Sequence, residues 1–243
     1  MQLIKLDATT STNHYLKQLA LQNHLKDYTV TITQKQTHGR GQTGAKWISE
    51  EGKNLTFSVL KIFENFKAID QVYLNCAVSL ALADALKELS VPDLRVKWPN
   101  DIMSGNHKIC GILIENILQG NKVSKSIIGI GLNVNQIRFS GLQNVSSLQL
   151  LLGKTLDLEI LMKRIITKLK IRLGVLETPE IKSLKVAYEE VLFRKDKPST
   201  FIGKSDIMFI GIIKGLSDDG KLVIQTEDKQ LKKFAVKEVK LLY

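Results

Sequence analysis

Cysteine is scarce in this chain, which has only Cys76 and Cys110 among its 243 residues. Two cysteines exclude a disulfide framework, and a reducing cytoplasm is the simplest setting for them. The N-terminal residues contain neither a long apolar segment nor a small-residue cleavage site, so we expect no signal peptide. No apolar run approaches the roughly 20 residues that a bilayer requires. The sequence therefore predicts a cytoplasmic protein with no membrane partner.

Histidine is also sparse, and its four copies do not occur at metal-ligand spacing. They stand at His14, His24, His38 and His107. Structural zinc sites are built from closely spaced Cys and His ligands. We therefore expect no zinc site and name no residue as a metal ligand.

Acidic residues are outnumbered, since 24 Asp and Glu face 35 Lys and Arg, which leaves a formal net charge of +11. The positive charge is spread along the chain, and its densest segment, residues 229–240, also contains Glu238. This distribution is typical of a solvated lysine-rich surface. Two other interpretations stay open: a nucleic-acid-binding face, and a surface that steers an acidic protein partner.

The hydrophobic pattern divides the chain into two parts. Up to about residue 194 it predicts helices following residues 10–13 and over 70–89, 158–173 and 179–193, and strands over 29–33, 55–59, 95–98, 111–118 and 123–130. Beyond it, short strands are predicted over 207–213, 221–226 and 230–236. We expect an α+β domain over residues 1–194, with helices flanking a mixed or mostly antiparallel sheet, and an SH3-like β-barrel over 195–243.

A polar, glycine-rich loop follows the first predicted strand and reads QTHGRGQTGAKW over residues 36–47. Its glycines allow the backbone to approach a ligand, while Arg40 and Lys46 add positive charge and Trp47 offers a flat ring. It is not a Rossmann fingerprint, because no helical pattern follows it, and it is not a P-loop, because GKS and GKT are absent. Taken alone, it is equally compatible with a flexible surface loop.

Two lysine-containing segments lie close together: KWPND at residues 97–101 and KICGILIE at 108–115. Burying a lone lysine is costly unless an anion pairs with it. Lysines, an amide and a carboxylate next to an apolar run suit a site that holds a phosphate group and a developing negative charge. Cys110 is expected on the opposite side of an extended segment from Lys108, so we do not interpret it as a nucleophile.

Taken together, STN at residues 11–13, the glycine-rich loop, KWPND, KICGILIE and GIGLNVN at 129–135 resemble the biotin protein ligases in order and approximate spacing. The resemblance covers essentially the whole chain. It implies a class II synthetase-like biotinyl/lipoyl ligase catalytic domain followed by the SH3-like domain. Larger members carry an N-terminal DNA-binding domain, and only ten residues precede Ser11. The chain therefore resembles the monofunctional kind, for which no DNA partner is expected.

The resemblance implies two half-reactions. Biotin and ATP, the latter accompanied by Mg²⁺, give biotinyl-5′-AMP and pyrophosphate. A lysine of the biotin carboxyl carrier domain of a carboxylase, such as acetyl-CoA carboxylase, then attacks the anhydride. Magnesium is expected to be held mostly by phosphate oxygens and water, so no protein ligand is assigned to it.

By the same resemblance, three residues are expected to be catalytic. Lys108 lies between the biotin carboxylate and the α-phosphate, and Arg40 closes over the adenylate. Asp101 orients the acceptor lysine or takes its proton. An equally good interpretation of Asp101 is that it caps a turn over residues 100–104.

The resemblance also implies two sets of binding residues. The biotin set consists of Ser11, Thr12, Asn13, Gln36, Gly39, Arg40, Gly41, Gln42, Lys108 and Gly111. The ATP set consists of Arg40, Trp47, Lys97, Asn100, Lys108 and Asn133. Ser11 and Thr12 also suit a helix N-cap, and the two roles are compatible. Trp98 is interpreted as a core residue rather than a ligand contact.

The loop departs from the family pattern at two positions. Gln42 stands where a second arginine is frequent, and Ala45 stands where a basic residue is frequent. Glutamine can hydrogen-bond a phosphate, but less strongly than arginine does. We therefore predict weaker retention of the adenylate, with the reaction class unchanged.

Two alternative functions and one question of assembly are left open. A lipoate or octanoate protein ligase shares a related fold, but KWPND and the GRG loop argue against it. A non-catalytic, basic nucleic-acid-binding protein predicts strong, salt-dependent binding without ATP. A homodimer through an apolar edge strand is compatible with the sequence, which does not identify the strand.

Overall fold

The computed structural model describes residues 2–204 and 206–243. Its larger sheet has the strand order β1-β2-β3-β7-β6-β5-β4. β1 and β2 pair in parallel, and each following pair is antiparallel. The strands are β1 (Leu3–Thr9), β2 (Val30–Gln36), β3 (Leu55–Ile62), β4 (Leu94–Lys97), β5 (Asp101–Ser104), β6 (His107–Gln119) and β7 (Lys122–Leu132). The predicted α+β class with a mostly antiparallel sheet is confirmed.

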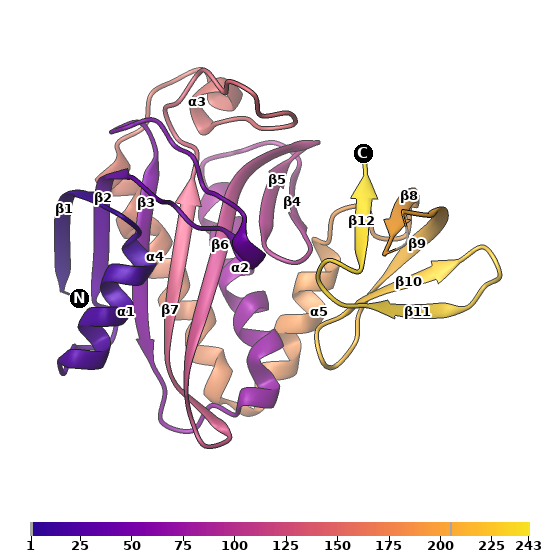
Figure 1. The fold of residues 1–243 in the computed structure, drawn as a ribbon, viewed down its shortest axis with the longest axis horizontal. Helices are drawn as coiled ribbons and strands as arrows, with labels where there is room; N and C mark the ends of the chain where they lie inside the picture. Colours follow the sequence, from indigo (N-terminus) through magenta and orange to yellow (C-terminus); the bar gives the residue numbers. More distant parts are fainter. Residues whose placement is uncertain (1, 205) are drawn as a thin grey trace.

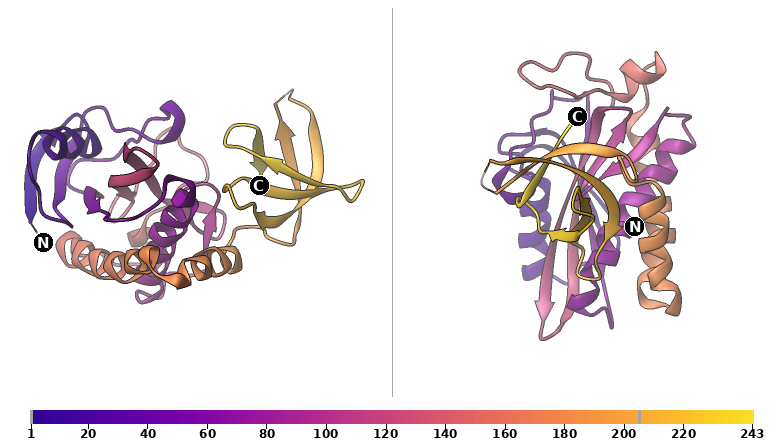
Figure 2. Two further views of the ribbon diagram at one scale, coloured as in Figure 1. Left: turned by 90° about the horizontal axis from the view of Figure 1, so that it is seen from below. Right: turned by 90° about the vertical axis from the view of Figure 1, so that its right-hand side faces the viewer.

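Helices cover both faces of this sheet (Figures 1 and 2). α1 (Thr12–Gln22) lies on one face, and α2 (Gln71–Lys87), α4 (Leu158–Gly174) and α5 (Lys182–Glu190) lie on the other, while the short α3 (Leu148–Leu152) lies beyond the end of the strands (Figure 1). α1 forms a small core with Leu60 and Ile127, while α2, α4 and α5 enclose the main core on the other face. Burial on two faces explains why β3 is buried without interruption from Leu55 to Leu60.

α2 is a long and mostly apolar helix. With the short turn before it, the segment Ala68–Lys87 is long and apolar enough to cross a membrane by length and composition alone. However, 61% of its most apolar window is buried inside the protein. α2 packs on α4 and α5, and Arg172 of α4 forms a bidentate ion pair with Asp84 at 2.7 and 3.2 Å. Its apolar composition is thus accounted for by its place in the core.

The second sheet is antiparallel and has the order β11-β10-β9-β8-β12. Its strands are β8 (Pro198–Gly203), β9 (Met208–Leu216), β10 (Leu222–Thr226), β11 (Leu231–Phe234) and β12 (Val239–Leu242). We call it the small β module. The predicted strands correspond to β9, β10 and β11, whereas β8 and β12 were not predicted. The domain boundary at residue 195 stays a prediction.

Two strands of the large sheet were also not predicted. β1 precedes the first predicted helix, and β5 occupies residues 101–104, where a turn was expected. The predicted turn is wrong, because Asp101–Ser104 pairs with β4 on one side and β6 on the other, and the turn lies at residues 98–100. Asp101, a predicted site residue, therefore lies on a strand that has a paired neighbour on each side.

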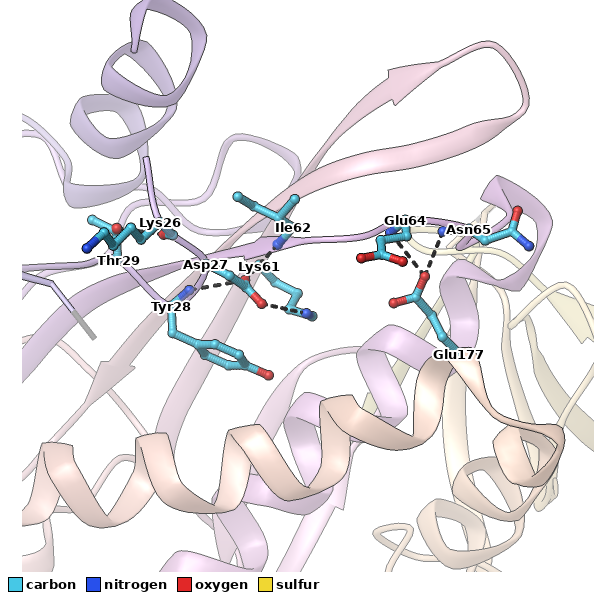
Figure 3. Close-up of polar contacts among 9 residues, drawn as sticks. All are labelled: Lys26, Asp27, Tyr28, Thr29, Lys61, Ile62, Glu64, Asn65 and Glu177. Carbon is cyan, nitrogen blue, oxygen red and sulfur yellow. Dashed lines mark hydrogen bonds and ion pairs between the residues drawn. The ribbon is translucent and has the colours of Figure 1, made fainter. Parts of the chain in front are cut away.

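The end of the large sheet remote from this turn is closed by two carboxylates (Figure 3). Asp27 accepts hydrogen bonds from the backbone N–H of Ile62 at 2.8 Å and from Lys61 Nζ at 2.7 Å. Glu177 Oε1 accepts from the backbone N–H groups of residues 64–65 at 3.1 and 2.7 Å. These contacts hold the end of β3 and the chain that follows it against their surroundings.

Candidate active site

A cavity of about 240 Å³, here the central cavity, opens at the end of the large sheet where β2 ends and β3 begins. Most of its walls come from β6, β7, the start of α1 and the glycine-rich loop, and Val236 contributes from the small β module. Predicted site residues that line it are Ser11, Thr12, Asn13, Gln36, Arg40, Gly41, Gln42, Trp47, Asn100, Asp101, Lys108 and Gly111. Predicted site residues separated by up to 100 positions, Ser11 to Gly111, therefore converge on one cavity.

Polar side chains meet where α1 enters the central cavity. The backbone N–H and Oγ1 of Thr12 donate to Gln36 Oε1 at 2.8 and 3.2 Å. Ser58, fully buried on β3, lies 2.7 Å from Thr12 Oγ1 and 2.6 Å from Asn13 Oδ1. The network fixes these groups before any ligand arrives, so they present a preorganised set of donors and acceptors.

Asn13 is held from three directions. Its Nδ2 donates to the Leu113 carbonyl at 3.1 Å and to Glu115 Oε2 at 3.0 Å, and Glu115 also pairs with Lys17 at 3.1 Å. Burial raises the pKa of Glu115, but the hydrogen bonds from Asn13 and Lys17 outweigh it and lower this pKa overall. A Cβ at Gly129 would lie 2.3 Å from Asn13 Oδ1, so only glycine leaves room for this side chain.

Ser11 performs the predicted capping role. Its hydroxyl accepts from the backbone N–H of His14 at 3.5 Å and caps α1. It also lines the central cavity, so the cap and a ligand contact are compatible, as expected.

The glycine-rich loop folds back on itself as a short antiparallel pair that joins Arg40 to Lys46. The Trp47 N–H donates to the Gly39 carbonyl at 3.0 Å, and the Gly41 N–H donates to the Ala45 carbonyl at 2.7 Å. A Cβ at Gly39 would lie 2.3 Å from the Trp47 carbonyl oxygen. Gly39 is therefore needed for the loop to close on itself, while Gly41 and Gln42 line the cavity.

Trp47 lies over two glycines of the sheet. A Cβ at Gly131 would come within 2.4 Å of the indole ring, and one at Gly111 within 3.2 Å. The indole Nε1 is buried and has no hydrogen-bond partner within residues 2–204 and 206–243. A buried donor without a partner is costly, and a bound ligand with an acceptor would satisfy it.

Lys108 and Asp101 form the charged centre of the central cavity. Lys108 Nζ lies 2.6 Å from Asp101 Oδ1, and the two side chains are 31% and 18% exposed. Asn100 fixes the neighbouring backbone, because its Nδ2 donates to the Ile112 carbonyl at 2.6 Å and its own carbonyl accepts from the Ile112 N–H at 3.0 Å. Asp101 is the only carboxylate among the described residues that line the cavity, and it is already paired with a lysine for which an anionic ligand can compete.

A β-bulge determines where Lys108 points. Ile102 pairs with Cys110 and Met103 with Lys108, so Ile109 is an extra residue in β6. Lys108 and Cys110 point to different sides, as expected, but not for the expected reason, because in an unbroken extended strand residues two apart share a face. The bulge separates them: Lys108 lines the cavity and Cys110 is fully buried, where burial raises the pKa of its thiol.

A sequence model of the Biotin/lipoate A/B protein ligase family matches residues 6–133, which contain nearly all of this cavity. The chain belongs to this family.

Individual relatives agree with this assignment. The bifunctional ligase/repressor BirA of Salmonella typhimurium is 29% identical over 226 residues, which cover 91% of this chain and 69% of that protein. The biotin–acetyl-CoA-carboxylase ligase of Paracoccus denitrificans is 33% identical over 131 residues, 53% of either chain. The structure of the biotin protein ligase from Aquifex aeolicus in complex with biotin and ATP superimposes with a TM-score of 0.80 at 28% identity, covering 99% of this chain and 98% of that one.

Three residues predicted for the site of this family member do not line the central cavity. Gly39 serves the fold of the loop. Asn133 is buried, and its Nδ2 donates to the Ser146 carbonyl at 3.1 Å. Lys97 lies in a second cavity, of about 180 Å³, between the large sheet and the small β module. Ligand contacts for these residues stay a prediction.

Sequence reasoning missed several residues that shape the cavity of this Biotin/lipoate A/B ligase. They are Thr56, Ser58, Gly129, Gly131 and Val236. The two glycines carried a signal, since two glycines spaced by two within an apolar strand indicate a close approach of another group to one face. Ser58 carried none, because a serine between apolar residues of a strand has no local feature that predicts its partner.

Arg40 is exposed and forms no ion pair within the described residues. The departures from the family pattern at Gln42 and Ala45 stay a prediction. Within the same described residues, no group of three His, Cys, Asp or Glu side chains is arranged to hold a metal ion.

Trp98 is partly buried against the main core, as predicted. Its Nε1 donates to the Gly220 carbonyl at 3.0 Å, and this hydrogen bond connects the KWPND turn to the small β module.

Proposed function

We propose that this protein is an ATP-dependent biotin protein ligase that forms biotinyl-5′-AMP and transfers biotin to a lysine of a biotin carboxyl carrier domain. The main support for this proposal is that the Lys108–Asp101 pair, the glycine-rich loop and the preorganised polar network share one cavity. The relationship to a ligase solved with biotin and ATP supports both substrates.

The polar network suits the ureido ring of biotin. This ring has one carbonyl acceptor and two N–H donors, which need complementary groups at fixed positions. Thr12, Asn13 and Gln36 supply amide and hydroxyl groups that line the cavity and are held by one another. Ile112 adds an apolar wall for the rings.

Adenylate formation requires two anions to approach each other, the biotin carboxylate and the α-phosphate. Lys108, which lines the cavity, would lie between them once it leaves Asp101, and Arg40 and the backbone N–H groups of the glycine-rich loop would add positive charge. Closure of this loop would also exclude water from the mixed anhydride.

Magnesium is expected with ATP and would neutralise charge on the phosphates. Within residues 2–204 and 206–243, Asp101 is the only carboxylate that lines the cavity, and it is paired with Lys108, which fits an ion held mainly by phosphate oxygens and water. In the second step, Asp101 orients or deprotonates the acceptor amine as Lys108 turns to the adenylate.

The acceptor is a carrier domain of a carboxylase, of which acetyl-CoA carboxylase is the expected example. The net charge of +11 favours fast association with an acidic partner. Both cysteines are free and buried, in keeping with a reducing cytoplasm.

The test is to incubate the protein with ATP, biotin and a recombinant carrier domain, and to measure the mass of the carrier. We expect an increase equal to one biotin less one water, dependent on ATP and absent when the acceptor lysine is replaced by arginine. A parallel reaction contains lipoate as a competitor of biotin, because lipoate attachment is the alternative function within this family. Preferential attachment of lipoate, or no attachment of either acid, would reject the proposal.

A further inference from the structure

Lys97 has an unusual position relative to Asp101. The two residues are directly paired across β4 and β5, so their Cβ atoms lie side by side on one face of the sheet. Nevertheless, Asp101 bonds to Lys108, and Lys97 Nζ lies 3.1 Å from the Tyr243 hydroxyl and 4.4 Å from the centre of the Tyr243 ring. Within the part of the chain that the structure describes, Lys97 forms no ion pair.

Tyr243 is itself fixed by its surroundings. It follows β12, the strand of the small β module at the edge that faces the tip of β4 and β5 (Figure 1). Its ring packs edge-to-face on Phe193 at 5.2 Å and 73°, and its carbonyl oxygen lies 3.5 Å from Asn144 Nδ2. The ring is therefore a defined surface against which Lys97 rests.

Asp101 forms part of the wall between two cavities, and each cavity contains a lysine. Asp101 lines both the central cavity, with Lys108, and the second cavity, with Lys97. A phenol hydroxyl and the face of its ring attract an ammonium group without neutralising it. Tyr243 thus holds the second cation beside the site without forming an ion pair with it.

We propose that Tyr243 is a positioning residue that keeps the Lys97 ammonium away from Asp101 and available to the phosphates of the nucleotide. This inference rests on the proposed ligase function. Without Tyr243, the Lys97 side chain can turn to its cross-strand neighbour Asp101 and form an ion pair that neutralises both charges. The phosphate side then loses a cation, while the biotin side, built on α1, β2 and β3, is untouched.

The experiment compares Tyr243→Leu, Tyr243→Phe, Lys97→Met and the double variant Tyr243→Leu/Lys97→Met. Biotin-dependent pyrophosphate release gives KM for ATP, and titration calorimetry gives Kd for biotin. We expect Tyr243→Leu to raise KM for ATP about tenfold with Kd for biotin unchanged, and Tyr243→Phe, which keeps the ring, to raise it only about twofold. The double variant should match Lys97→Met, because Tyr243 acts through Lys97.

Several outcomes would overturn this inference. One is a KM for ATP in Tyr243→Leu within twofold of wild type. Another is an independent, multiplicative effect in the double variant. A loss of biotin affinity in parallel with ATP affinity would indicate a merely structural role. Wild-type protein is assayed first, and if it releases no pyrophosphate with biotin, the proposed function itself fails. If wild type is active and Tyr243→Leu has the same KM for ATP, only the role of Tyr243 fails.

Discussion

Lys108 of β6 and Asp101 of β5 form a 2.6 Å ion pair on the wall of the central cavity, beside the bulge that aims Lys108 inward. Both groups are largely shielded from water, so removing either one leaves the other as a poorly solvated charge. The pair keeps the lysine in place until an anion competes for it. In the proposed reaction, binding of that anion releases the carboxylate beside the incoming acceptor amine.

Replacing Lys108 should impair adenylate formation much more than it impairs folding. Lys108→Ala takes away the cation expected between the carboxylate and the α-phosphate, and the rate of pyrophosphate release should fall about 10²–10³-fold. Lys163→Met, a change at an exposed ion pair on α4, is the matched control and should retain the wild-type rate. Normal carrier labelling by Lys108→Ala would refute its assigned role.

Replacing Asp101 should separate the two half-reactions. Asp101→Asn keeps the size of the side chain but cannot accept a proton, so transfer from preformed adenylate to the carrier should slow about a hundredfold. Adenylate formation should fall by less, since it needs Lys108 rather than the carboxylate. Single-turnover assays of each step measure the split, and equal losses in both steps would contradict the proposed role.

Two glycines on β7 offer a matched pair of variants. Gly129→Ala places a methyl group 2.3 Å from Asn13 Oδ1, and Gly131→Ala places one 2.4 Å from the Trp47 ring. We expect Gly129→Ala to weaken biotin binding at least tenfold, because the amide is displaced from its network. Gly131→Ala should instead change the tryptophan fluorescence and weaken ATP binding. Titration of each variant with biotin and with ATP distinguishes the two effects. If both variants weaken binding of the two ligands alike, the assignment of Asn13 to the biotin side and Trp47 to the ATP side is wrong.

Restoring an arginine to the loop should lengthen the lifetime of the bound intermediate. Gln42→Arg adds a charge-assisted hydrogen bond donor next to the cavity, which corresponds to about tenfold slower release of the adenylate. Release is followed with radiolabelled ATP after rapid filtration. Gln42→Leu removes the existing hydrogen-bonding group and should not lengthen the lifetime of the bound adenylate. If Gln42→Arg and wild type release the adenylate equally fast, the predicted weak retention is wrong.

Glu115 predicts how the stability of the protein depends on pH. Hydrogen bonds from Asn13 and Lys17 overcome the effect of burial and lower the pKa of Glu115 below its ordinary value of 4.5. The unfolded chain then binds a proton more readily, so the stabilisation is complete above pH 4.5 and is lost as the pH falls through the folded-state pKa. The free energy of unfolding of wild type should exceed that of Glu115→Gln at pH 7, and the difference should shrink under acid. A difference that is constant with pH would contradict this.

The secondary structure was predictable where periodicity was local and strong. The helices α2 and α4 and the hairpin of β6 and β7 follow from apolar spacing, an Asp157 cap and a Gly120 turn. β1, β5, β8 and β12 were not predictable, because four- to seven-residue strands with mixed polarity become strands only when neighbours complete their hydrogen bonds.

The sequence by itself determined the chemical inventory of this protein: the basic glycine-rich loop, the two lysine-containing segments and the short polar groups before α1. Their order and spacing were enough to predict the family. The tertiary structure decided which of these groups meet. A bulge at Ile109 aims Lys108 at Asp101, buried Ser58 completes the network of Thr12 and Asn13, and the small β module draws Lys97 to Tyr243. The last two of these pairings join residues far apart in the chain, and the first depends on an irregularity in strand pairing, so only the packing of strands and modules brings these groups together.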